Sequence, residues 1–433
     1  MNIEPTISII SINYNGKELI PPFLAAIKAI KYPKDRYEVI VVDNNSSDGS
    51  DLLVEEKYDW VKLIRSNRNL GFGGGNNLGI KAAKGDFLFL VNNDTVVDSN
   101  CLLEFNDCYK RWSVKHKVGA LSAKLVLMDK YLPVFLKDVF LHDYIYSKSQ
   151  NYGVNKTPFI IKKPMVKRYE EDVFLPLNYQ IKSGLDLELV VKNPGETDGE
   201  IAIGKGVSCR IGYLKNKDFR NALFELSANQ VRECLFDLVQ NAGSYIFRDG
   251  FGRDRGSLII GGDQYYEEDV GQYDKEEKIS AFCGAGVFIN KKAINDTGGF
   301  DESFFMYYED GDLSFRFKEA GWDIVYCPKA KIRHIHAASS KEWSPSFIYN
   351  VERSRLLFVG KHWPRLLVVW EWVKYILKDT IAVPVGHLFF MEYRASLGKL
   401  WLRLKVNLSI APHILRSLMK PDRLSYSDVK KLY

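Results

Sequence analysis

The sequence has few of the features that mark a disulfide-bonded, zinc-binding or membrane-spanning protein. None of its six cysteines forms a CxxC pair, so we expect reduced thiols and neither a zinc site nor a disulfide framework. The first residues, MNIEPTISII, lack the basic segment and long apolar run of a signal peptide. No segment reaches the roughly 18 uncharged apolar residues that a spanning helix needs. We therefore expect a cytoplasmic protein without a transmembrane helix.

Charge of one sign is not in large excess over the whole chain, but it is unevenly distributed. The 433 residues carry a formal net charge of +6. From Val351 onward, fifteen Lys and Arg stand against six Asp and Glu, so this segment carries +9 and the rest of the chain −3. A basic segment beside a mildly acidic body indicates a separate partner for the basic segment.

Apolar runs alternate with helical patterns over the first 128 residues. The runs occupy residues 7–14, 37–44, 61–66 and 87–94. This alternation predicts a mostly parallel sheet with helices on both faces, in which ligands bind outside the carboxyl ends of the strands. Polar residues cluster at those ends: Asn13, Tyr14, Asn15, Asp43, Asn44, Asn45, Asn92, Asn93 and Asp94.

Residues 69–79, NLGFGGGNNLG, contain five glycines. We predict a glycine loop followed by a helix from about Gly74 to Ala83, and such a loop exposes backbone N–H groups suited to phosphate. A tight turn that needs positive φ would explain the glycines equally well. Asp94 favours the functional interpretation, because a carboxylate at the end of the next strand binds Mg²⁺ or Mn²⁺, which in turn holds a diphosphate.

Several motifs in order carry a family resemblance. ISINYNG, VIVVDNNSSDGS, NRNLGFGGGNNLGI and FLFLVNNDT resemble family 2 inverting glycosyltransferases of the GT-A fold, and most closely the rhamnosyltransferase-like branch that builds bacterial surface polysaccharides. CGAGVFINKKAI, GGFDESFFMYYEDGDLSFRFKEAGW and YCPKAKIRHIHAASS continue the resemblance. It covers roughly residues 5–128 and 236–360 and implies a Rossmann-like α/β domain.

The resemblance also implies roles for single residues. Asp94 and His334 are the implied metal ligands, with His336 as the alternative histidine. Asn92 stands where the family's DxD motif has its first acid, which removes one negative charge from the metal site. Asp43 corresponds to the carboxylate that contacts the base or ribose of the donor. The implied contacts to donor nucleotide and sugar are Asn13, Tyr14, Asn15, Asp43, Asn45, Asn69, Gly71, Gly73, Asn76, Asn92 and Asn93.

The segment YYEDGDLSFRF supplies the candidate catalytic acids. Inverting sugar transfer needs one base that deprotonates the acceptor hydroxyl, and Asp310 matches the base of the family's ED motif. Glu309 is the candidate for orienting the acceptor. Acids in the first turn of a helix are also favoured by the helix dipole alone. Asp312 and Arg316, four residues apart, are expected to form a structural pair.

We divide the chain into four segments. Residues 1–128 form the nucleotide-sugar-binding half of the GT-A domain, and residues 236–345 its acceptor-binding and catalytic half. Residues 129–235 show period-2 patches such as LDLELVV and are expected to form a β-rich, sandwich-like insertion, either inert or binding glycan, a partner enzyme or another subunit. Residues 346–433 are expected to form basic amphipathic helices that lie on an anionic membrane surface or pack against the core or a sister subunit.

Together these features predict an inverting glycosyltransferase that uses Mg²⁺ or Mn²⁺. Its expected partners are a dTDP- or UDP-sugar donor, with rhamnose favoured by the resemblance, and a growing glycan or lipid-linked glycan. A homo-oligomer is left open. We expect no nucleic-acid partner and a location in the cytoplasm, peripheral to the inner face of the membrane. A sugar-nucleotide nucleotidyltransferase and an inactive glycan-binding or scaffold protein are the alternatives.

Overall fold

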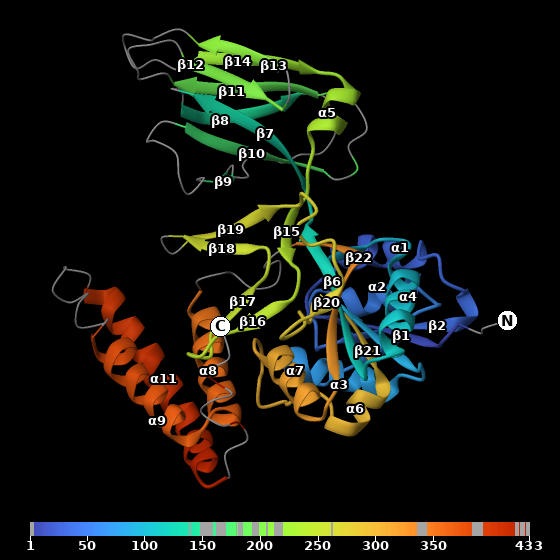
Figure 1. Ribbon diagram of the computed structural model, residues 1–433, viewed down its shortest axis with the longest axis vertical. Helices are drawn as coiled ribbons and strands as arrows, with labels where there is room; N and C mark the ends of the chain where they lie inside the picture. The colour runs from blue at the N-terminus through green and yellow to red at the C-terminus, as the bar shows by residue number, and fades with distance from the viewer. Residues whose placement is uncertain are drawn as a thin grey trace. The chain divides into compact units, whose positions relative to one another are not determined.

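The computed structural model describes residues 4–137, 140–147, 159–161, 170–178, 180, 185–192, 199–204, 207–211, 220–260, 263–335, 344–382, 393–420, 424 and 429. The chain forms two compact units (Figure 1). The first comprises Met1–Leu125, Gln240–Arg255 and Gln272–Tyr433, and the second Val126–Val239 and Gly256–Gly271.

A mostly parallel sheet is the centre of the first unit. Its strands lie in the order β6-β21-β4-β1-β2-β3, and β21 is antiparallel to both of its neighbours. The bounds are β1 (Ile7–Asn13), β2 (Tyr37–Asp43), β3 (Lys62–Arg65), β4 (Phe87–Val91), β6 (Val118–Leu127) and β21 (Gly286–Asn290). The other strands described for this part are β5 (Thr95–Val97), β15 (Leu238–Asn241), β16 (Ser244–Ile246), β17 (Gly252–Asp254), β20 (Glu277–Lys278) and β22 (Asp323–His334).

Helices cover both faces of this sheet, as Figure 1 shows for α1, α2 and α4 on one side and α3, α6 and α7 on the other. The first face buries the large core cluster, in which Phe23 of α1 and Phe105 of α4 pack against alternate residues of the strands. The bounds are α1 (Ile20–Lys28), η1 (Lys34–Arg36), α2 (Ser50–Lys57), α3 (Gly71–Ala82), α4 (Cys101–Ser113), α6 (Lys291–Thr297) and α7 (Glu309–Glu319). The predicted fold class, α/β with a mostly parallel sheet, is confirmed.

The glycine segment differs from the prediction, because helix α3 begins at Gly71 and not near Gly74. The glycines therefore form the first turns of the helix instead of a preceding loop. A Cβ atom on Gly71, which has φ +71°, would lie 2.0 Å from the backbone oxygen of Phe305. A Cβ on Gly73 would lie 3.0 Å from Cβ of Phe300. Close packing of the helix against other parts of the chain requires these glycines.

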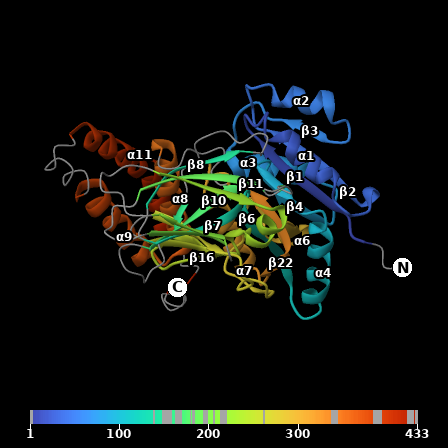
Figure 2. The same cartoon turned by 90° about the horizontal axis from the view of Figure 1, so that it is seen from above.

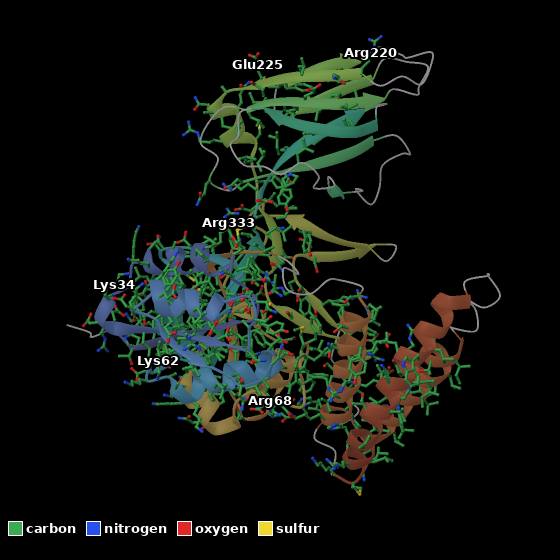
Figure 3. The ribbon with its side chains drawn as sticks, turned by 180° about the vertical axis from the view of Figure 1, so that it is seen from behind. Lys34, Lys62, Arg68, Arg220, Glu225 and Arg333 are labelled. Carbon is green, nitrogen blue, oxygen red and sulfur yellow. The ribbon has the colours of Figure 1, made fainter. Side chains whose placement is uncertain are left out.

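The second unit contains a two-sheet β insertion, as predicted. One sheet has the order β13-β12-β7-β10-β9 and the other β14-β11-β8. Leucine, isoleucine and valine side chains from both sheets form a single core. On the outer strand β14, residues alternate between buried and exposed, and Figure 3 shows Arg220 and Glu225 on that strand. The bounds are β7 (Lys130–Lys137), β8 (Phe140–Ser147), β9 (Phe159–Ile161), β10 (Glu170–Leu177), β11 (Leu185–Lys192), β12 (Gly199–Ile203), β13 (Val207–Ile211), β14 (Arg220–Leu226), α5 (Ala228–Cys234), β18 (Ser257–Ile260) and β19 (Asp263–Glu268).

The C-terminal part of the first unit is helical, as predicted. It comprises α8 (Pro345–His362), α9 (Arg365–Lys374), the π-helical segment η2 (Tyr375–Ala382) and α11 (Tyr393–Leu418). Figures 1 and 2 both show α9 and α11 on the same side of α8. No helix within the described part of the chain is long and apolar enough to span a bilayer.

A buried charge network connects α8 to α7. Asp312 is fully buried and accepts hydrogen bonds from Arg316 Nε and His362 Nε2, each at 2.8 Å. Lys361 Nζ lies 2.7 Å from the same carboxylate. These partners, led by His362, lower the pKa of Asp312 well below its usual value, although burial acts in the opposite direction. The predicted pairing of Asp312 with Arg316 is confirmed, and the network joins the C-terminal helices to the helix that carries Asp310.

The packing of α3 on β1 gives the first prediction. A Cβ on Gly79 would lie 2.4 Å from Cγ2 of the buried Ile10, whereas Gly398 of α11 has open space at its Cβ position. We expect Gly79→Ala to lower the free energy of unfolding by about 1–3 kcal/mol through overpacking. Gly398→Ala should raise it by about 0.5–1 kcal/mol, since alanine favours the helix. Urea unfolding of both variants checks this, and equal stabilisation by the two changes would contradict it.

Candidate active site

Side-chain amides join the carboxyl ends of β1, β2 and β4. Asn13 Nδ2 donates to Asp43 Oδ1 at 3.0 Å and to Ser50 Oγ at 2.7 Å. Its Oδ1 accepts a hydrogen bond from Asn93 Nδ2 at 2.8 Å. Asn13 and Asp43 are almost fully buried. The structure thus brings Asn13, Asp43 and Asn93 together and gives them a role in joining the strand ends.

Three other predicted donor contacts face solvent just beyond these strands. Tyr14 is 48% exposed, and Asn15 and Asn45 are exposed as well. Asn15 and Asn45 have left-handed backbone conformations, with φ of 51° and 66°. Asparagine tolerates this conformation better than most residues do. The open rim of the strand ends is therefore lined by an aromatic ring and two amides.

The start of α3 is held to the end of β2. Asn44 Nδ2 donates to the backbone oxygen of Gly71 at 2.9 Å, and Asn69 Oδ1 accepts from the Gly71 N–H at 2.9 Å. Asn76 is buried and donates to the backbone oxygen of Phe72 at 3.0 Å. Asn69, Gly71 and Asn76 thus have partners within the protein, and their contact with a donor stays a prediction.

Asp94 and His334 lie side by side, although they are far apart in the sequence. Strand β5 pairs with the end of β22, so that Thr95 lies opposite His334. His334 Nε2 is 3.2 Å from Asp94 Oδ1, and both side chains are nearly buried. On the other edge of the ring, His334 Nδ1 is 2.8 Å from Gln240 Oε1. Since an amide oxygen accepts hydrogen bonds, Nδ1 is the donor to Gln240, and Nε2 is the ring nitrogen that faces Asp94.

This arrangement fits a divalent cation. Asp94 Oδ1 is buried and makes no hydrogen bond within the described residues. A carboxylate oxygen and an imidazole lone pair that face each other need a cation or an added ring proton. Nowhere in the described ranges do three His, Cys, Asp or Glu side chains gather as metal ligands. Asp94 and His334 would thus supply two ligands and leave other positions to water and phosphate oxygens, as Mg²⁺ sites commonly do. His336 lies outside the described residues.

The backbone before Glu309 and Asp310 is strained. Tyr307 and Tyr308 both have positive φ, 68° and 67°. Left-handed backbone at a bulky residue costs about 1–3 kcal/mol, and such strain clusters at functional sites. Helix α7 begins directly after these two residues. The strained turn therefore aims the first residues of α7, including both candidate catalytic acids.

Burial raises the pKa of both candidate acids. Asp310 Oδ2 accepts from the Gly284 N–H at 3.1 Å, and Oδ1 accepts from the Gly311 N–H at 2.8 Å. Loss of hydration raises the pKa of Asp310, while these two N–H groups oppose the rise. Burial and the neighbouring Asp310 raise the pKa of Glu309, whose Oε2 has no hydrogen-bond partner in the described part of the chain. Both carboxylates are therefore more basic than ordinary ones, which suits a group that accepts a proton.

A single turn connects Asp310 to the end of β4. Gly284 N–H binds Asp310, and the backbone oxygen of the next residue, Ala285, accepts from the Asn92 N–H at 3.2 Å. Strand β21 then begins with Gly286 opposite Val91. Asp310 and the segment that begins at Asn92 are thus hydrogen-bonded to two consecutive residues, Gly284 and Ala285, at the carboxyl end of β4.

Two further polar residues of this site were missed in the sequence. One is Gln240, which binds His334. The other is Asp254, whose Oδ1 accepts from Ser244 Oγ at 2.9 Å within the β16–β17 hairpin. Burial raises the pKa of Asp254 to about 6, and the charge of Asp310 adds to the rise, while Ser244 opposes it. The segment VQNAGSYIFRDGFGRDRG carries both residues, but only the fold shows which side chains they face.

Among solved structures, the chain is similar in shape to GalNAc-T7 crystallised with UDP, GalNAc and Mn²⁺, with a TM-score of 0.49 and 11% identity over 96% of this chain and 58% of that chain. It is also similar to Staphylococcus aureus TarS 1–349, with a TM-score of 0.40 and 13% identity over 95% of this chain and 89% of that chain.

Curated relatives match shorter parts of the sequence. An N-acetylglucosaminyl-diphospho-decaprenol L-rhamnosyltransferase of Mycobacterium tuberculosis is 34% identical over 85 residues, which are 20% of this chain and 28% of the relative. A poly(ribitol-phosphate) beta-glucosyltransferase of Bacillus spizizenii is 37% identical over 120 residues, 27% of this chain and 19% of the relative. The chain spans less than a third of the length of these relatives.

Family comparisons match both halves of the sheet domain. Residues 8–107 match the family described as Glycosyl transferase family 2, and residues 262–348 match Glycosyltransferase like family 2. The first match contains Asp43 and Asp94, and the second contains Asp310 and His334. Both matches are to family 2 glycosyltransferase models, and they lie on either side of the β insertion.

Proposed function

We propose that this protein is an inverting glycosyltransferase that moves a sugar from a nucleotide-diphosphate donor to a hydroxyl of a growing surface polysaccharide. The supporting observation is that a possible cation site and a possible base are tied to one turn at the carboxyl end of β4. Asp94 and His334 could bind the cation, and Asp310 could accept a proton. Both are connected through the turn at Gly284 and Ala285.

The donor would bind across the carboxyl ends of the strands. Tyr14, Asn15 and Asn45 form the exposed rim there, and Asp43 lies beneath them at the end of β2. We assign the base and ribose to this rim and the diphosphate to the side of Asp94. The names of the relatives favour rhamnose or glucose as the transferred sugar. We propose dTDP or UDP as its carrier.

Mg²⁺ or Mn²⁺, held by Asp94 and His334, would neutralise charge on the diphosphate leaving group. Gln240 fixes the tautomer of His334, so that Nε2 is available as a ligand. Asn92 and Asn93 place neutral amides beside Asp94, in keeping with a site of low total negative charge.

Asp310 would act as the base. As the acceptor oxygen attacks the anomeric carbon, its proton moves to the Asp310 carboxylate. The bond from the anomeric carbon to the diphosphate oxygen breaks, the nucleoside diphosphate leaves with the electron pair, and the configuration inverts. Glu309, directly before Asp310 at the start of α7, would orient the acceptor. We propose a lipid-linked acceptor and hence a peripheral location at the inner face of the membrane.

The metal site yields one prediction. Calorimetry with UDP and dTDP should show binding that depends on Mn²⁺ and is lost in Asp94→Ala and His334→Ala. Gln240→Leu should weaken Mn²⁺ binding about 10- to 100-fold, because the ring loses its orienting partner. Asp107→Asn, on an exposed part of α4, is the matched control. Binding of neither nucleotide to the wild type, with or without metal, would count against the transferase.

The base yields a second prediction. Asp310→Asn should lower turnover by about 10²- to 10⁴-fold, since the amide cannot accept the proton. Donor binding should stay at the wild-type level, because Asp310 acts on the acceptor. Sugar transfer in single-turnover assays measures the first effect and calorimetry the second. Turnover within a few-fold of wild type would assign the base elsewhere.

Asp254 yields a third prediction, for stability without metal. Its folded pKa of about 6 exceeds the ordinary 3.8, so the folded state binds more protons between these values and this group lowers stability as the pH rises through them. Asp254→Asn should therefore stabilise the protein at pH 7 by about 2 kcal/mol and have little effect near pH 4. Thermal unfolding in EDTA at both pH values tests this. A gain of equal size at both pH values would show that Asp254 does not titrate in this way.

A further inference from the structure

The C-terminal helices expose an unusual amount of apolar surface. Eleven of the twenty large apolar side chains that are exposed among the described residues lie on α9, η2 and α11 or directly after α11. We call these eleven the outer apolar face. They are Leu366, Val369, Trp370, Val373, Leu377 and Ile381 on α9 and η2, Trp401, Leu404, Leu408 and Leu415 on α11, and Met419 just after it.

These residues form a stripe on each helix. Their spacing of three, four or seven residues places them along one side of the helix. The opposite sides are buried: Val368 and Tyr375 on one element, and Val406, Ile410 and Ile414 on the other, belong to the core cluster that includes α8. Both helices thus bury one apolar stripe against the protein and expose a second one. A helix that only packs against its own core needs a single stripe.

The charges around the outer apolar face have one sign. Over residues 365–381 and 398–420, every exposed charged side chain that the structure describes is basic. The acid Glu371 in this region is buried and 3.4 Å from Arg355. Three of the bases, with His413, also line a cavity of about 200 Å³, whose one acid, Asp301, is paired with Lys361. The exposed bases are Arg365, Lys374, Lys378, Lys405, Arg416 and Lys420.

The sign of these charges distinguishes between two candidate occupants of the outer apolar face, a second copy of the chain and a membrane. If a second copy covered the outer apolar face through a two-fold axis, its own bases would face these bases, and like charges oppose such contacts. An anionic bilayer complements them instead. Trp370 and Trp401, 63% and 58% exposed, are of the residue type that prefers the boundary between headgroups and acyl chains.

We propose that α9, η2 and α11 form a docking surface for an anionic membrane, in which the outer apolar face enters the boundary of the acyl chains and the surrounding lysines and arginines bind lipid phosphates. Such a helix pair lies in the plane of the interface and does not cross the bilayer. The docking surface is separate from the donor site, so it holds or fails independently of the proposed sugar transfer.

Flotation of the full chain with lipid vesicles tests this proposal. We expect binding to mixed vesicles of phosphatidylcholine and phosphatidylglycerol, weak binding to phosphatidylcholine alone, and release as NaCl rises. The triple variant Lys374→Gln, Lys378→Gln, Lys405→Gln should bind mixed vesicles about 100-fold more weakly. Trp370→Ser with Trp401→Ser should weaken binding by at least about 10-fold and abolish the blue shift of tryptophan emission on vesicle addition.

Val114→Ser with Lys115→Gln is the matched control, because it removes one exposed apolar and one exposed basic residue from the turn that follows α4. It should bind vesicles as the wild type does. Calorimetric nucleotide binding and thermal unfolding of every variant report folding and the donor site separately. Vesicle binding that is unchanged in the triple variant would overturn the proposal. A second contrary outcome is a wild type that binds no vesicles but is a dimer in light scattering, together with a tryptophan variant that is a monomer.

Discussion

The candidate active site depends on one backbone turn, at Gly284 and Ala285. Its N–H group holds Asp310, and its next carbonyl holds the chain where β4 ends. Strand β21 starts at this turn and runs antiparallel beside β4. The two segments of the sheet domain are therefore joined by the pairing of β21 with β4. The turn therefore holds the proposed base by its carboxylate and the segment of the proposed cation ligand by its backbone.

The strain at the start of α7 is offset by a charge network farther along the same helix. The consecutive left-handed tyrosines and the buried Glu309 destabilise the start of α7. Farther along the same helix, Asp312 is enclosed by Arg316, Lys361 and His362. Breaking a buried charge network of this kind is strongly unfavourable, so the network anchors α7 where its first turn is strained. Helix α8 thereby supports the two candidate catalytic acids without contacting them.

The sequence predicted the sheet, the β insertion and the C-terminal helices, because each has a clear hydrophobic period. Family motifs pointed to Asp94, His334 and Asp310, and the fold brings the first two together and connects the third to the same sheet edge. The role of the glycines was not predictable, since the atoms that exclude a Cβ come from Phe305 and Ile10, which the local pattern does not reveal. Gln240 and Asp254 were missed for a related reason: an amide or a carboxylate acquires its role from the partner that it faces.

The position of Gln240 has a consequence for protein engineering. It is the first residue after Val239, where the chain returns from the β insertion to the sheet domain. An excision of the insertion that removed even one residue too many would delete the partner of His334 and free the imidazole to adopt either tautomer. The boundary between the two units at Val239 therefore tolerates almost no shift along the sequence. Shortened versions of this protein would best keep every residue from Gln240 to Arg255.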